Sequence, residues 1–173
     1  VFGDSDAYST IYLDDGLQSN GTAVMKVTDV DQATEYSTGD LIVRNDVTKP
    51  GESPGYVNVS VNQQNAEIKI DEDGDGNMQS SEIQSFDGSG LPKWIRVQRD
   101  GTSYTASYSP DGSNWTQIAA FTLEEATDVQ DVGVAVTSST DENARVEFGQ
   151  FEVTDTSDLG ALPVRAYLAA CLL

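Results

Sequence analysis

The sequence predicts an all-β domain: an antiparallel two-sheet jelly-roll sandwich of about 10–12 strands. Two observations favour this fold class. Short segments of alternating apolar and polar residues recur along the chain, and turns rich in Gly, Asp, Asn and Ser separate them. The composition is also typical of strands and turns, since Thr, Val, Tyr, Ser, Gly and Asp are abundant and 38% of the residues are hydrophobic.

Each expected strand is a run in which apolar side chains recur at every second position, as a half-buried strand requires. In residues 22–30 the alternation starts at Ala23, and in residues 65–70 it places Ile68 and Ile70 on one face. The same pattern continues along the chain, and the expected strands are 22–30, 41–43, 55–61, 65–70, 93–99, 103–108, 115–121, 132–136 and 144–153. Two of the turns are explicit, because Asp-Gly pairs at residues 100–101 and 111–112 are strong hairpin signals.

Four aromatic residues in this region, Trp94, Tyr104, Tyr108 and Trp115, are candidates for stacking on sugar rings. Aromatic residues that alternate along strands more often belong to the core, and we expect that role here. Arg44 lies in the middle of an expected strand. We expect it to pair with a buried carboxylate rather than to bind a ligand.

The strand pattern ends near residue 153, which predicts a sandwich over residues 1–154 and an apolar tail over residues 155–173. The segment Leu159–Leu173 carries one charge, Arg165. An apolar tail of this kind needs a partner. It packs on its own sandwich, docks on an adjacent copy, or is a vector-derived extension. We favour the adjacent copy, which makes residues 159–173 the contact of a homo-oligomer or filament.

The chain is strongly acidic. Nine Lys and Arg residues face 29 Asp and Glu residues, which gives a formal net charge of −20. Such a chain repels nucleic acid and anionic membrane surfaces. No apolar run reaches the roughly 18 residues that a membrane span needs. Dispersed acidity is typical of proteins that work in very high salt, so we expect a halophilic source; an ordinary acidic secreted protein is the alternative.

The chain lacks the residues that most catalytic sites use. It has no His, and its single Cys, Cys171, forms neither an internal disulfide nor a metal site by itself. Acid pairs such as Asp14-Asp15 and Glu124-Glu125 are unavoidable among 29 acidic residues and do not by themselves indicate a glycosidase. We therefore predict no catalytic residues and no enzymatic activity.

Three N-x-S/T sequons begin at Asn20, Asn58 and Asn114 and are candidate glycosylation sites. Val1 is typical of an N-terminus that was trimmed after export. With the acidic composition, these features predict an extracellular or cell-surface glycoprotein.

The most specific motif is the twelve-residue segment 71–82. Acidic residues occupy positions one, three and five, Gly occupies position six and Glu position twelve, as in a calcium-binding loop. The predicted oxygen ligands are Asp71, Asp73, Asp75, Asn77 (through its backbone carbonyl) and Glu82. The flanking segments are typical of strands, so we expect a calcium loop within a β-hairpin. The alternative is a solvated acidic turn.

Three groups of segments, in order along the chain, carry a resemblance to a known family: Gly39–Asp46 with Gly55–Val57, Trp94–Trp115, and Asp131–Ser138 with Phe148–Val153. Together they resemble the concanavalin A-like lectin/glucanase superfamily, nearest its laminin-G-like jelly-roll modules related to the regulation-of-enolase-protein domain. The resemblance implies two antiparallel sheets in a secreted carbohydrate-binding or adhesion module. Catalytic members carry a strand of the form Glu-x-Asp-x-x-Glu, and this sequence contains no such strand.

These observations predict a non-catalytic extracellular binding or adhesion module, with calcium as a stabilising cofactor and carbohydrate as the ligand class. The first alternative is a structural subunit of a cell-surface layer, sheath or filament, whose partners are other copies of the chain. The second alternative is a glycoside hydrolase. The sequence does not single out residues that contact the ligand.

Overall fold

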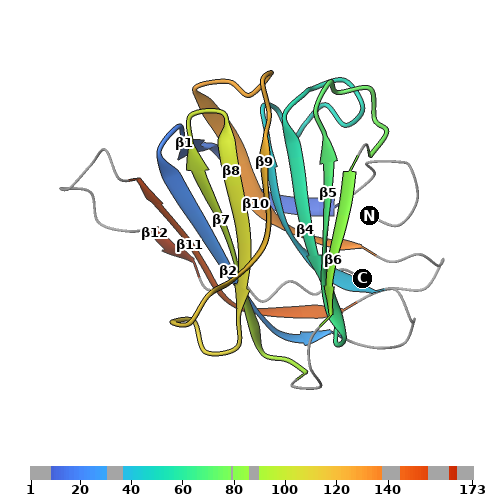
Figure 1. Ribbon diagram of the computed structural model, residues 1–173, viewed down its shortest axis with the longest axis vertical. Helices are drawn as coiled ribbons and strands as arrows, with labels where there is room; N and C mark the ends of the chain where they lie inside the picture. The colour runs from blue at the N-terminus through green and yellow to red at the C-terminus, as the bar shows by residue number, and fades with distance from the viewer. Residues whose placement is uncertain are drawn as a thin grey trace.

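Twelve β-strands make up the ordered framework of the computed structural model (Figure 1). The residues described are 9–30, 37–78, 80–85, 90–137, 145–155 and 164–166. They form two six-stranded sheets in which all the pairings are antiparallel. Within these residues there is no helix long and apolar enough to cross a membrane. The predicted all-β sandwich of about 10–12 strands is confirmed.

We call the two sheets A and B. Sheet A contains, in spatial order, β1 (Ser9–Gln18), β10 (Val129–Thr137), β3 (Thr38–Arg44), β4 (Tyr56–Val61), β5 (Asn65–Asp71) and β6 (Ser80–Ser85). Sheet B contains, in spatial order, β12 (Val164–Ala166), β11 (Val146–Asp155), β2 (Gly21–Val30), β7 (Lys93–Asp100), β8 (Ser103–Ser109) and β9 (Thr116–Thr122).

Strands from opposite ends of the chain complete both sheets. In sheet A, β1 pairs with β10, so that Ser9 lies opposite Val136. In sheet B, β2 pairs with β11, so that Ala23 lies opposite Val153. The local hairpins of β3 to β6 and of β7 to β9 fill the rest of each sheet. Non-local pairing around local hairpins is the arrangement expected of a jelly roll.

The core lies between the inner faces of the two sheets. Val57 and Val59 of β4 in sheet A and Ile95 and Val97 of β7 in sheet B are fully buried members of one hydrophobic cluster. Every second residue of these strands faces inward, as the sequence pattern predicts. Burial of this apolar surface is the main favourable contribution to folding.

Both predicted Asp-Gly turns are present. Gly101 joins β7 to β8 with a left-handed φ of +62°. In the loop from β8 to β9, the carboxylate of Asp111 accepts hydrogen bonds from the backbone N–H groups of Ser113 and Asn114, both at 2.8 Å. The hydrogen bonds from Asn114 and Ser113 hold the pKa of Asp111 far below its usual range. Gly112 provides the left-handed residue of this loop, with φ +75°.

The C-terminal tail adds one strand to its own sandwich. Strand β12 pairs with β11, with Val164 opposite Val153. This part of the tail therefore packs on its own domain, which was one of the alternatives for the tail. Strand β11 ends at Asp155, one residue past the predicted boundary of the sandwich. Residues 159–163 and 167–173 lie outside the described residues, and self-assembly through them stays a prediction.

Candidate functional site

The predicted calcium loop joins β5 to β6 at one end of sheet A. β5 ends at Asp71, β6 begins at Ser80, and the two strands pair antiparallel from Ile70 and Ser80 onward. The prediction of a loop within a β-hairpin is therefore confirmed. We call residues 71–78 the acidic loop.

Asp71 is the buried carboxylate of the acidic loop. Its carboxylate accepts hydrogen bonds from the backbone N–H groups of Gly74 at 2.8 Å and Gly76 at 3.0 Å. Burial raises the pKa of Asp71, while these two hydrogen bonds and the charge of Arg44 oppose the rise. The net rise indicates that the positive charge around this carboxylate does not fully compensate its burial.

Arg44 forms a buried ion pair with Asp71. Its Nη2 atom lies 3.7 Å from Oδ2 of Asp71, and both side chains are fully buried. The Nε atom of Arg44 donates to the carbonyl of Ser53 at 2.8 Å, and the guanidinium lies 4.9 Å from the centre of the Tyr56 ring. The prediction that Arg44 pairs with a buried carboxylate is confirmed.

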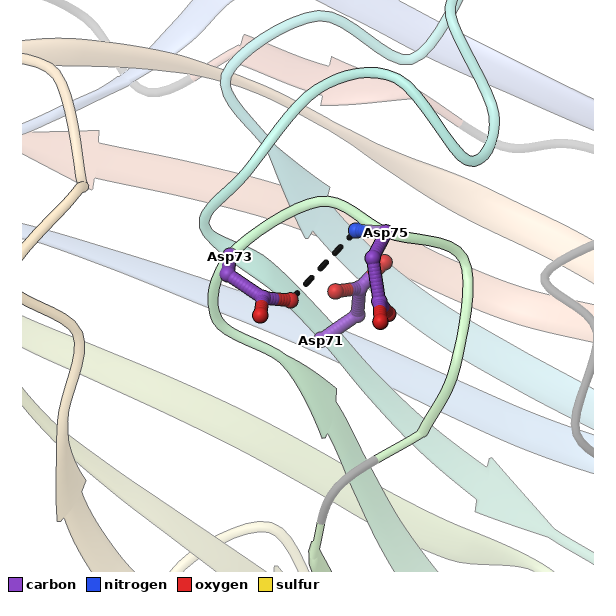
Figure 2. A group of neighbouring side chains, drawn as sticks. All are labelled: Asp71, Asp73 and Asp75. Atoms are coloured by element: carbon purple, nitrogen blue, oxygen red, sulfur yellow. Dashed lines mark hydrogen bonds between the residues drawn. The ribbon is translucent and has the colours of Figure 1, made fainter.

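Asp73 and Asp75 bring two more carboxylates to the same point from the exposed side of the loop. Figure 2 shows the three side chains converging, and one oxygen from each of Asp71, Asp73 and Asp75 lies within 4.8 Å of the other two. The backbone N–H of Asp75 donates to Asp73 at 3.4 Å. Hydrogen bonds from the side chain and backbone of Asn77 lower the pKa of Asp75.

Two glycines set the path of the acidic loop. Gly74 and Gly76 have left-handed φ angles of +77° and +84°. A Cβ atom on Gly74 would lie 2.6 Å from the backbone nitrogen of Pro54, so a larger residue has no room there. The backbone N–H of Gly55 donates to the carbonyl of Glu72 at 3.2 Å. The loop that precedes β4 therefore packs against the acidic loop and limits its movement.

The donor set fits a hard divalent cation. Calcium binds carboxylate oxygens at about 2.3–2.6 Å, so two oxygens on one ion are separated by at most about 5 Å. The three oxygens of the acidic loop meet this limit without rearrangement. The convergence of three carboxylates gives the loop a concentration of negative charge that a cation would offset.

The structure does not place the ligand oxygens of the other two predicted residues, Asn77 and Glu82, beside the three carboxylates. Asn77 donates its backbone and side-chain N–H groups to Asp75, and its predicted ligand is the carbonyl oxygen. The backbone of Glu82 lies within β6 opposite Ile68, three residues before Asp71 and therefore about 10 Å away along the strand. The side chain of Glu82 lies outside the described residues, and its role as a ligand stays a prediction.

Two of the aromatic candidates belong to the core, as expected. Tyr104 is 1% exposed, stacks on Phe121 and donates its hydroxyl hydrogen to Gln130. Burial raises the pKa of Tyr104 to about 12. Tyr108 is half-buried and packs against the same cluster. The ring of Tyr104 is therefore closed to a ligand.

The two tryptophans correct the expectation of a core role. Both are half-buried, and neither belongs to the hydrophobic clusters. The Nζ atom of Lys26 lies 4.3 Å from the ring centre of Trp94, and the guanidinium of Arg96 lies 4.2 Å from that of Trp115. The alternation itself contained this information: because Ile95 faces the core, its neighbours Trp94 and Arg96 face outward.

Sequence reasoning missed a polar pocket of about 530 Å³ on the outer face of sheet B. Its lining residues come from β2, β7, β8 and the turns beside them, so no local motif marks them. They are Asn20, Thr22, Gln98, Arg99, Asp100, Ser103 and Thr105. Hydroxyl and amide groups predominate, and the pocket includes no aromatic ring.

The three sequons have different environments. Asn58 is fully buried in β4, and its amide nitrogen donates to the hydroxyl of Tyr56 at 3.2 Å. This corrects the prediction for Asn58, because the folded chain has no room for a glycan on that nitrogen. Asn20 and Asn114 are exposed, and their glycosylation stays a prediction.

A family profile matches the C-terminal half of the sandwich. Residues 83–156 match a family described as a protein of unknown function, DUF1349. No curated protein matches the sequence.

Several solved structures share the two-sheet architecture. A functionally unknown protein from Saccharomyces cerevisiae superposes with a TM-score of 0.61 at 14% identity, over 87% of this chain and 92% of that chain. A mutant of the GH43 protein BlXynB from Bacillus licheniformis has a TM-score of 0.62 at 11% identity, over 86% of this chain and 33% of that chain. The exoplasmic/lumenal domain of VIP36, in its Ca2+/Man3GlcNAc-bound form, has a TM-score of 0.55 at 10% identity, over 88% and 76%.

At these identities the similarity establishes the fold alone. It confirms the concanavalin A-like fold that the three groups of segments in the sequence predicted. The chain spans only a third of the length of the GH43 protein, so the activity of that whole enzyme does not follow from the match.

Proposed function

We propose that this chain, which has the concanavalin A-like lectin/glucanase fold, is a non-catalytic, calcium-stabilised extracellular module that binds carbohydrate. The observation that carries the calcium part is the convergence of Asp71, Asp73 and Asp75 within 4.8 Å. A cation at this point offsets three neighbouring negative charges in a chain of net charge −20.

Calcium stabilises the fold in this proposal because the acidic loop contacts several parts of sheet A. Asp71 ends β5 and pairs with Arg44 at the end of β3, while the loop before β4 contacts the backbone of Gly74 and Glu72. A cation bound by Asp71 therefore fixes three strands relative to one another. The calcium-bound form of VIP36, which has a similar fold, supports this proposal.

The proposed ligand class rests on the fold and on the outer faces of the sheets. The exoplasmic/lumenal domain of VIP36, which has a similar fold, was crystallised in a Ca2+/Man3GlcNAc-bound form. The half-buried rings of Trp94 and Trp115 and the polar pocket on sheet B are surface features of the kind that contact sugars. A non-catalytic role is supported by the lack of a Glu-x-Asp-x-x-Glu strand in the sequence, the arrangement of acids that catalytic members of the superfamily carry.

Calcium titration followed by calorimetry and thermal unfolding tests the calcium part. We expect one site, and stabilisation by about 2.7 kcal/mol when free calcium is 100 times Kd. Asp73→Ala should abolish both signals, because it removes a ligand oxygen outright. Asp111→Ala is the control, because it removes an exposed carboxylate from a turn that holds no other acidic residue. Equal calcium responses in both variants and the wild type would contradict the proposal.

A glycan array, probed with the calcium-loaded protein, tests the ligand class. We expect selective binding to a small set of glycans, and Man3GlcNAc is the first oligosaccharide to titrate. The same glycans should show no new reducing ends after prolonged incubation with the protein. Hydrolysis that a single Asp or Glu substitution abolishes would replace the binding module with a glycosidase.

A further inference from the structure

Two positively charged side chains of sheet B have no acidic partner among the described residues, although the chain has a net charge of −20. Lys26 of β2 and Arg96 of β7 form neither an ion pair nor a hydrogen bond with any residue that the structure describes, and the Nε atom of Arg96 is buried without an acceptor. The other Lys and Arg side chains of the described residues pair with a carboxylate or donate to a backbone carbonyl: Arg44, Lys49, Lys69, Lys93, Arg99 and Arg145.

Lys26 and Arg96 are neighbours on the outer face of sheet B. Strand β2 pairs with β7 (Figure 1), and Lys26 lies opposite Trp94, two residues before Arg96. This diagonal relation places the Cα atoms of the two cationic residues about 7–8 Å apart. Both side chains face outward, because the adjacent residues Met25 and Ile95 are fully buried in the core.

Two tryptophan rings hold these cations in place. Lys26 lies over the ring of Trp94, and Arg96 lies over that of Trp115. A Cβ atom on Gly112 would lie 3.1 Å from Nε1 of Trp94, so the turn between β8 and β9 packs against that ring. We call Lys26, Trp94, Arg96 and Trp115 the cationic face. Trp and Arg are the residue types that most often dominate the binding energy of protein–protein interfaces, so this surface suits a protein partner.

An acidic residue of the same sheet leaves the cationic face unneutralised. Glu152 of β11 lies opposite Val24, which lies opposite Arg96, so Glu152 is two strands, about 10 Å, from Arg96. The carboxylate of Glu152 accepts a hydrogen bond from Gln150 at 3.0 Å. Burial lowers the pKa of Arg96, which indicates that its guanidinium has lost water without gaining a carboxylate in exchange. A carboxylate from another molecule would complete this environment.

The chain itself carries complementary acids in the loop between β9 and β10, residues 123–128. Glu124, Glu125 and Asp128 are exposed in this loop. The side-chain nitrogen of Asn45 donates to the carbonyl of Glu125 at 2.7 Å, which ties the loop to the body of the sandwich. A loop that is already fixed loses little conformational freedom when it binds.

We propose that the cationic face of one copy binds the β9–β10 loop of a second copy, so that Lys26 and Arg96 pair with the exposed acids of that loop. This contact goes beyond the proposed carbohydrate function and does not depend on it. The two surfaces are different parts of the molecule, one on the outer face of sheet B and the other beyond the end of β9. The contact is therefore head-to-tail, and it builds a ring or an open filament of copies.

Salt should control this contact with a sign opposite to that of an ordinary surface ion pair. Two copies of net charge −20 repel each other at low salt, where the field extends about 30 Å at 0.01 M. In 1 M salt that range falls to about 3 Å, whereas ion pairs that are partly buried within a contact are screened much less. The copies should therefore be separate at low salt and associate in molar salt.

Sedimentation of the full chain between about 0.01 M and 1 M NaCl tests the proposal. We expect the wild type to be monomeric at the low end and associated at the high end. Arg96→Gln and Lys26→Gln should each weaken association in molar salt by about tenfold or more. Lys69→Gln is the matched control, because it removes the same charge from a lysine that pairs with Glu67 on sheet A, and it should associate like the wild type.

A charge exchange tests the two sides of the contact together. Arg96→Glu should lose self-association, and so should the double variant Glu124→Lys, Glu125→Lys. An equal mixture of these two proteins should regain association, because each then offers the charge that the other lacks. Thermal unfolding of each variant checks that it is folded before the measurement.

Four results would overturn the proposal. The first is a wild type that stays monomeric in molar salt. The second is equal association in Arg96→Gln and Lys69→Gln, which would assign self-association to another surface, such as residues 159–173. The third is a charge-exchange mixture that stays monomeric. The fourth is a monomeric wild type that binds polygalacturonate through Arg96, which would make an acidic polymer, rather than a second copy, the partner of the cationic face.

Discussion

The acidic loop and the turn between β8 and β9 each contain an aspartate that accepts hydrogen bonds from its own loop, but the two aspartates lie in different surroundings. In the acidic loop, Asp71 accepts two backbone hydrogen bonds from residues that follow it, and the loop contains left-handed glycines. In the turn, Asp111 does the same, next to the left-handed Gly112. Yet the pKa of Asp71 is raised and that of Asp111 is lowered.

The difference teaches that surroundings, rather than local hydrogen bonding, decide what an aspartate loop does. Asp111 is exposed, and its own turn satisfies its charge. Asp71 is buried, and Asp73 and Asp75 add negative charge beside it. The turn is therefore complete without a ligand, whereas the acidic loop has a charge excess that a cation would relieve.

The largest effect on stability should come from removing the guanidinium of Arg44, the positive charge that pairs with Asp71. Arg44→Met leaves a buried carboxylate without its ion-pair partner, and we expect a loss of about 3–5 kcal/mol in the free energy of unfolding. Urea unfolding with and without calcium measures it. Calcium should recover part of the loss, because it supplies positive charge at the same carboxylate. A loss under about 1 kcal/mol would show that Asp71 is satisfied without Arg44.

A smaller loss of stability should follow from Gly74→Ala, and it should exceed the loss from the same substitution at Gly101, which has a similar backbone conformation. Gly74→Ala combines a left-handed φ with a Cβ atom 2.6 Å from the backbone of Pro54, and we expect a loss of about 2–4 kcal/mol. Gly101→Ala is the control, because its φ is also positive but no atom lies within 4 Å of the added Cβ. It should lose only about 1 kcal/mol. Equal losses in thermal unfolding would mean that the packing against Pro54 does not restrain the acidic loop.

The smallest effect should appear in the pH dependence of stability without calcium. The lowered pKa of Asp111 contributes stability that is present above its ordinary value of 3.8 and is lost as the pH falls below it. The raised pKa of Asp71 has the opposite sign, so its ionisation reduces stability as the pH rises above 3.8. Thermal unfolding of Asp111→Asn and Asp71→Asn between about pH 2 and pH 7 separates the two. Asp111→Asn should make Tm depend less on pH below 3.8. Asp71→Asn should make Tm depend less on pH just above 3.8. Identical changes in both would contradict the comparison.

The sequence was sufficient for the features that depend on local order. Alternation placed Val57 and Val59 in the core, Asp-Gly pairs marked the hairpins, and the spacing of acids in residues 71–75 marked the point where three carboxylates converge. These features were predictable because a strand or tight loop fixes the relation between residues a few positions apart.

Features that depend on what covers a face were not predictable. Asn58 and Asp40 occupy outward positions of their strands, where an exposed side chain is the default, yet both are fully buried. In both cases tertiary packing buried a side chain that the local pattern leaves exposed. The backbone of Glu82 lies opposite Ile68, a register that the twelve-residue spacing does not encode, and its role as a ligand stays a prediction.

The pairing of β1 with β10 and of β2 with β11 also sets when the chain can fold during its synthesis. Neither sheet is complete until residues 129–155 have been made, because these form the strands next to β3 and β2. Native contacts of such high sequence separation make folding slow, in the millisecond-to-second range typical of all-β sandwiches. A nascent chain that stops before β10 exposes the inner faces of both sheets at once, so its solubility before completion rests on its dense negative charge rather than on its core.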